Sequence, residues 1–273
     1  MIAAGINYPL FEDIDDKEIL NSIASLPAEN DLPYDDGVPM ETSRHRDQMN
    51  LLIDSLKAYW KDSRKYYVGG NMFLHFDILN RRKFRGPDFF LVTDVDNRER
   101  KSWVVWQEEM RFPDLIIELL SDTTRKTDKG EKKELYGRIF RTPEYYIYDP
   151  FTQEFGGYRL SGNFYKDVLP DPKENRIYSP ITGLYLVIKE NWLRWMTNDG
   201  YILPSHEELF EQEKQRAEQE KHRADIAEKC LNETIRKMLA KGKLTVDDLL
   251  TVVDFYRQTL TEKFSLNVFY ERR

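Results

Sequence analysis

Two acidic residues stand where a buried sheet could bring them together. Asp88 follows Gly86-Pro87 and opens the apolar segment 89–92, whereas Glu118 lies inside the apolar run 115–120. A carboxylate in a buried strand is costly unless an ion pair, hydrogen bonds or a metal ion compensate its charge. Glu118 therefore requires a partner, and a core ion pair and a metal site both remain open on this evidence alone.

A helix predicted over residues 128–140 provides a candidate partner for Glu118. On a helical wheel, one face roughly 80° wide contains Asp128, Lys132, Leu135, Tyr136 and Ile139. Lys132 lies in the middle of that face, and the two neighbouring lysines lie at its edge or outside it. An inward Lys132 can form a simple ion pair with Glu118, or extend its charged end past the apolar surface into solvent. If Asp88 joins them, two carboxylates can chelate a hard divalent cation while the ammonium assists.

Taken together, these segments resemble the Uma-type restriction endonuclease family of the PD-(D/E)xK nuclease superfamily. In that family an Asp opens one strand, and a second strand of the form PD-hydrophobic-E ends in a Ser. A D-x-x-x-K helix and an aromatic strand follow. The corresponding segments here are Pro87-Asp88, the stretch PDLIIELLSDTTRKTDKGEKKELYGR and the strand PEYYIYDP. The resemblance extends from about Pro39 to Glu207.

The resemblance implies an α/β fold, with a central mixed sheet flanked by helices, and an endonuclease that hydrolyses DNA with Mg²⁺ or Mn²⁺. It implies Asp88 and Glu118 as catalytic metal ligands and Lys132 as the catalytic lysine. The sequence departs from the full motif, because the position two residues after Glu118 holds Leu120 instead of lysine. The prediction therefore depends on Lys132 supplying the positive charge from the helix.

Further residues are predicted to assist at the same site. Glu41, at the entry to the first helix, is a candidate auxiliary acid, and Ser121 is expected to close a turn or to orient Glu118. His45, between two arginines, is expected to be exposed at the surface, with a phosphate contact or a position at the edge of the active site as the alternative. The basic residues expected to contact the DNA backbone are Arg81, Arg82, Lys83, Arg85, Arg125 and Lys126.

The charge of the chain argues only mildly against a nucleic-acid partner. The formal net charge is -7, but residues 1–40 hold nine acids against one base. The remaining residues therefore hold 40 bases against 39 acids, which leaves room for a local basic face. No run of about 18 apolar residues occurs, so we expect no membrane-spanning segment. The single Cys230 fits a reducing cytoplasm.

The elements that must position the site follow from apolar periodicity. We predict a helix over 43–60, which we expect beside the helix at 128–140. The predicted strands are 66–68, 72–76, 89–92, 103–106, 115–119 and 145–148, then a hairpin of 155–160 and 164–168. Residues 181–196 are expected to close the same domain. We divide the chain into an acidic, loosely ordered arm (1–38), an endonuclease-like domain (39–204) and a helical tail (205–273).

The tail is predicted to begin with one long charged helix over 205–240, followed by a second helix over 245–260. Small and apolar residues recur at a step of seven, at Phe210, Ala217, Ala224, Leu231 and Met238. The second position of such a seam is poor, because Glu213 and Glu220 occupy it. A weak coiled coil and a solvated single helix both remain open. Helical tails of this kind often serve dimerisation or docking, so we expect a homodimer.

A second function remains compatible with the same sequence. The chain could be a non-catalytic module that kept the nuclease fold, in which the ion pair of Glu118 and Lys132 is structural. The tail would then act by binding a partner or by oligomerising. Fold alone does not separate these functions.

Overall fold

The computed structural model describes residues 25–33, 42–61, 63–80, 82–243, 245, 247–248 and 250–251. Contacts divide the chain into two units, Met1–His206 and Glu207–Arg273. The candidate site lies in the first unit, and each unit is described by itself.

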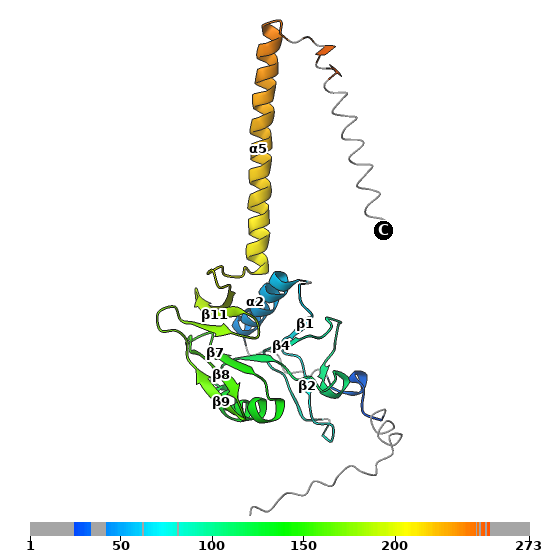
Figure 1. Cartoon of the computed structure of the whole chain (residues 1–273), viewed down its shortest axis with the longest axis vertical. Coiled ribbons are helices and arrows are strands. Elements are labelled where there is room, and N and C mark those ends of the chain that lie inside the picture. Colours follow the sequence, from blue (N-terminus) through cyan, green and yellow to red (C-terminus); the bar gives the residue numbers. More distant parts are fainter. Residues whose placement is uncertain are drawn as a thin grey trace, which may run out of the picture. The chain divides into compact units, whose positions relative to one another are not determined.

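The first unit is built on a six-stranded mixed sheet with the order β1-β4-β6-β7-β8-β9 (Figure 1). Its strands are β1 (Tyr66–Gly69), β4 (Phe89–Thr93), β6 (Leu115–Leu119), β7 (Glu144–Tyr148), β8 (Phe155–Ser161) and β9 (Phe164–Val168). β6 and β7 run parallel, and the other neighbouring strands are antiparallel. Every residue of β6 and β7 is buried. Burial on both faces explains why these segments are almost continuously apolar.

Two smaller sheets complete the unit. One contains β10 (Arg176–Ser179), β11 (Leu184–Lys189) and β12 (Trp192–Met196), all antiparallel. The other places β2 (Leu74–His75) between β3 (Phe84–Arg85) and β5 (Trp103–Val104). The short helical turns η1 (Glu29–Asp31) and η2 (Val105–Gln107) lie in the loops. The predicted α/β fold with a central mixed sheet is confirmed.

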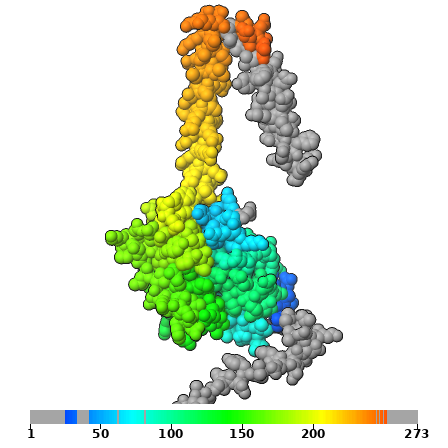
Figure 2. Space-filling view, in the orientation of Figure 1, coloured from blue at the N-terminus to red at the C-terminus, as the bar shows by residue number. Residues whose placement is uncertain are grey.

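The principal helices of this unit pack on opposite faces of the six-stranded sheet. Helix α2 (Ser43–Trp60) shares a core with Leu115, Ile117 and Leu119, and with strands β11 and β12. Figure 2 shows α2, in light blue, against the yellow-green segment that contains β12, and the Gln48 side chain bonds to the Leu193 backbone there. The expectation that the two helices lie side by side is wrong. Residues of a strand alternate between its faces, so consecutive apolar residues of β6 require a cover on each side.

The opposite face is covered by a continuous helical segment with two wide turns. It consists of α3 (Arg125–Thr127), η3 (Asp128–Lys132), α4 (Lys133–Leu135) and η4 (Tyr136–Phe140). In η3 and η4 the hydrogen bonds span five residues, so each turn takes up more residues than in an α-helix. Residues four apart consequently stay aligned, and Tyr136 and Phe140 both pack into the core. The predicted inward position of Ile139 is wrong, because that side chain is 58% exposed.

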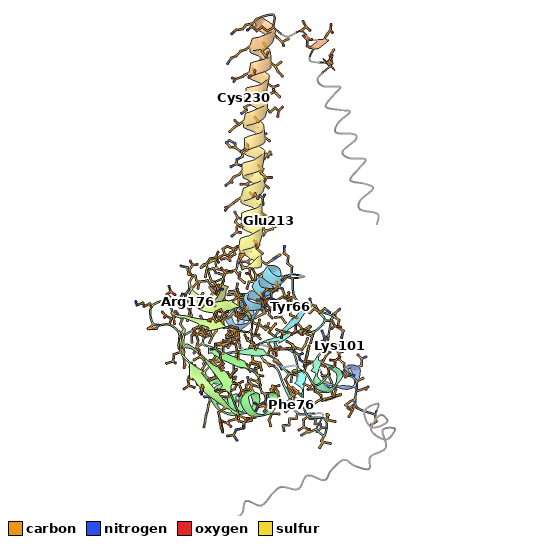
Figure 3. All side chains as sticks on the ribbon, in the orientation of Figure 1. Tyr66, Phe76, Lys101, Arg176, Glu213 and Cys230 are labelled. Atoms are coloured by element: carbon orange, nitrogen blue, oxygen red, sulfur yellow. The ribbon has the colours of Figure 1, made fainter. Side chains whose placement is uncertain are left out.

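Helix α5 (His206–Ala240) has 35 residues, none of which is buried, and from Glu207 onward it belongs to the second unit. Figure 3 labels Glu213 and Cys230 on this helix. Gly242, at a φ of 63°, ends it, with the Gly242 and Lys243 backbone N–H groups bonded to Leu239 and Met238. Most of the predicted second tail helix lies outside the described residues. Among the described helices, none combines the length and the apolar character needed to cross a bilayer.

Candidate active site

Strand register brings Asp88 and Glu118 together. In the antiparallel pair of β4 and β6, Phe89 lies opposite Ile117, so one further step places Asp88 opposite Glu118. Residues opposite each other on neighbouring strands project from the same face of the sheet. The Leu119 backbone N–H donates to Asp88 Oδ2 at 2.8 Å, and the Asp88 backbone N–H donates to Glu118 Oε2 at 3.5 Å. Two acids that lie 30 positions apart in sequence are therefore neighbours in the fold.

Glu118 is completely buried, and both of its oxygens have partners. The Tyr136 hydroxyl donates to Oε1 at 2.7 Å, and Lys132 Nζ lies 3.1 Å from Oε2. Burial raises the pKa of Glu118 to about 7, against the lowering effect of the Lys132 charge and with a further increase from Asp88. Burial also raises the pKa of Asp88, although Lys132 and the Leu119 N–H oppose it. The pair therefore holds a proton at a pH where ordinary carboxyls have lost theirs.

Lys132 lies between two buried acids. Its Nζ is 2.7 Å from Asp128 Oδ1 and 3.1 Å from Glu118 Oε2, and its side chain is 18% exposed. Burial works to lower the pKa of Lys132, but the charges of Glu118, Asp128 and Asp88 outweigh it and raise that pKa well above its usual value. Lys132 therefore remains an ammonium ion at neutral pH.

The segment of the chain that contains this site matches a known protein family. Residues 20–188 match the family model Uma2, whose description is "Putative restriction endonuclease". The chain belongs to the Uma2 family. The Uma2 match covers Asp88, Glu118 and Lys132, and it confirms the resemblance stated from the sequence.

A solved structure is also similar to this Uma2-family chain. It is titled the crystal structure of a putative nuclease belonging to DUF820 from Anabaena variabilis ATCC 29413. The two share 19% sequence identity, the similarity covers 63% of this chain and 96% of the other, and the TM-score is 0.43. A search of curated proteins found no match.

The two carboxylates fit a hard divalent cation. Mg²⁺ is commonly held by one or two carboxylates and keeps several waters. Within the described residues, no group of three or more His, Cys, Asp or Glu side chains is arranged to hold a metal ion. Any cation here would therefore take Asp88 and Glu118 from the side chains, and its other ligands from backbone carbonyl groups or water.

The residues predicted to assist are only partly gathered at this point. Glu41 and Arg81 lie outside the described residues. The Ser121 hydroxyl lies 3.0 Å from the Thr124 hydroxyl and accepts from the Thr124 N–H at 3.1 Å. Ser121 thus closes the turn before α3, which is the first of the two roles expected for it.

Several of the predicted DNA-contacting bases are engaged in ion pairs. Arg125 pairs with Asp149 and Glu154, Arg85 pairs with Glu131, and Lys83 lies 3.3 Å from Asp77. Arg82 and Lys126 are exposed. Both residues therefore present their side chains to solvent.

The expectation for His45 is wrong. Its side chain is 3% exposed, with Nε2 3.2 Å from the Leu120 carbonyl and Nδ1 2.8 Å from the Thr42 hydroxyl. His45 therefore connects the start of α2 to the chain just after β6. Thr42 caps α2 by accepting from the His45 N–H, a local spacing that could have indicated this position from the sequence.

Two residues of the site had no role assigned from the sequence. Asp128 and Tyr136 were placed on the inward face of the helix, and each now bonds to a member of the site. Periodicity predicted which helix face points inward, but only the packing of the helical segment on the sheet shows which residues that face contacts.

Proposed function

We propose that this protein is a metal-dependent endonuclease that hydrolyses DNA phosphodiester bonds. The observation that carries the proposal is the pairing of Asp88 with Glu118 beside the ammonium of Lys132. Membership of the Uma2 family supports a nuclease function in general. The proposal goes further than family membership, because it names the catalytic residues, the metal ion and the DNA substrate.

Asp88 and Glu118 would hold Mg²⁺ or Mn²⁺, which would polarise the phosphate and lower the pKa of a bound water. Because burial raises the pKa of both carboxyl groups, any proton that they hold would have to leave before they could bind a cation. The Leu119 N–H orients Asp88, and the Tyr136 hydroxyl orients Glu118. Lys132 stays protonated, so its part is to neutralise negative charge that develops on the phosphate, and not to accept a proton from water.

Arg82 and Lys126 are proposed to contact the DNA backbone, with Lys83, Arg85 and Arg125 contributing where their acidic partners release them. Binding that rests on such contacts weakens steeply as salt increases.

A second function is favoured by one observation. Glu118 is 0% exposed and its two oxygens are paired with Tyr136 and Lys132, as in a purely structural ion pair. A non-catalytic module with a nuclease fold would have such a site. Asp88, however, is only partly buried as a residue, whereas Glu118 is completely buried.

The test is a plasmid-cleavage assay with Mg²⁺ and with Mn²⁺. The variants Asp88→Asn and Glu118→Gln should abolish cutting, since each removes a charged ligand while preserving shape. Glu134→Gln provides a matched control, because Glu134 is 62% exposed on the same helical segment and pairs with Arg138 at the surface. If the wild-type protein neither cuts DNA nor binds metal, the non-catalytic function is the one supported. If the Asp88→Asn and Glu118→Gln variants cut normally, these two residues do not take part in the chemistry.

A further inference from the structure

A metal ion bound by Glu118 would compete with the Lys132 ammonium for the same carboxylate. Glu118 Oε1 accepts from the Tyr136 hydroxyl, so Oε2 is the oxygen that Lys132 contacts at 3.1 Å. Oε2 also faces the Asp88 backbone N–H, at 3.5 Å. A cation bound between Asp88 and Glu118 therefore draws on the same carboxylate that neutralises Lys132.

Displacing that ammonium without another partner would be unfavourable. The Lys132 side chain is 18% exposed, and a largely buried charge that loses its counterion is strongly destabilising. A metal site that depended on such a displacement would bind its cation weakly.

Asp128 provides the second partner. It lies four residues before Lys132, its side chain is 1% exposed, and its Oδ1 is 2.7 Å from Lys132 Nζ. The Tyr145 hydroxyl donates to the Asp128 backbone carbonyl at 2.9 Å, which connects this turn of the helix to β7. The backbone of Asp128 is thus held in place independently of Lys132.

We propose that Asp128 is a positioning residue that keeps the Lys132 ammonium paired, which leaves Glu118 able to bind a divalent cation. The inference rests on the proposed function, because it concerns the same acid pair. It assigns different roles to the two acids that contact Lys132. Glu118 exchanges its partner when a cation binds, whereas Asp128 keeps its own.

The experiment is a double-mutant cycle read out by Mn²⁺ titration of the full chain, by calorimetry or by electron paramagnetic resonance. With Lys132 present, Asp128→Asn should weaken Mn²⁺ binding roughly 10- to 100-fold, the usual loss when a partner behind a metal ligand is removed. In the Lys132→Met background the same substitution should have little effect, since no ammonium remains to be displaced. A residue with a merely structural role would weaken binding equally in both backgrounds.

Two variants complete the design. Asp128→Glu keeps the negative charge and should retain most of the affinity, and Glu134→Gln removes the acid of an exposed i,i+4 pair on the same segment and should change nothing. If Asp128→Asn fails to fold by circular dichroism, Asp128→Ser takes its place in the cycle. Wild type that binds no Mn²⁺ would refute the proposed function itself. Wild type that binds, with equal losses in both backgrounds, would overturn only the role of Asp128.

Discussion

Replacing Glu118 by glutamine should change how the stability of the metal-free protein depends on pH. Burial raises the pKa of Glu118 from its usual 4.5 to about 7 in the folded protein. Between those two values the folded chain binds a proton that the unfolded chain has lost. Stability must then fall as pH rises, because the unfolded state binds fewer protons than the folded state.

The size of the effect follows from the two pKa values. A difference of about 2.5 units corresponds to about 3 kcal/mol, at 1.36 kcal/mol per unit. The contribution of the protonated carboxyl is fully present below pH 4.5 and is lost as pH rises through about 7. Glu118→Gln has no titrating group at this position, so its stability should lack this component. Lys132 retains Asp128 as its partner in that variant.

The assay is urea unfolding followed by tryptophan fluorescence, with EDTA present, at intervals from pH 4.5 to 8. The quantity to plot is the unfolding free energy of wild type minus that of Glu118→Gln, which cancels the titration of groups far from the site. This difference should fall by about 3 kcal/mol across the range and level off above neutral pH. A difference that is flat with pH, or that rises, would refute the argument that burial dominates at Glu118.

Three further outcomes are expected. Asp149→Asn should destabilise the protein by about 1–3 kcal/mol at neutral pH. The pKa of Asp149 is lowered, because hydrogen bonds from Thr152, Phe151 and Arg125 outweigh burial. The contribution of Asp149 to stability should therefore disappear as pH falls into the acidic range. An Asp149→Asn variant as stable as wild type at pH 7 would contradict this. Leu52→Ala should cost about 2–5 kcal/mol in denaturant unfolding, since Leu52 is 0% exposed. Gly157→Ala should cost about 1–3 kcal/mol and lower the melting temperature, because a Cβ there would lie 2.4 Å from Tyr146 Cδ1.

Much of the local structure was predictable from sequence periodicity. The helix over 43–60 and the strand over 115–119 have the predicted bounds, and the hairpin differs only by one residue at the end of β8. The helical wheel also identified Lys132 as the lysine that reaches Glu118. These features depend on patterns within a single element, where the spacing of apolar residues largely specifies which side is buried.

Other features depended on contacts between distant segments. The wide turns of η3 and η4 turn Ile139 outward, although the 3.6-residue wheel had placed it inside. His45 is buried because the chain after β6 returns to the start of α2, which no local pattern contains. The two helices lie on opposite faces because β6 is apolar on both.

The sequence by itself determined that an acid stands inside a buried strand, that a second acid opens another, and that a lysine faces inward from a helix. It could not determine that Asp88 lies opposite Glu118, because register is set by pairing between strands and not within one. Nor could it show that Asp128 would share Lys132 with Glu118. The tertiary structure decided both, because the Asp88–Glu118 and Glu118–Lys132 contacts join separate elements, whereas the Asp128–Lys132 pair lies within one helical segment.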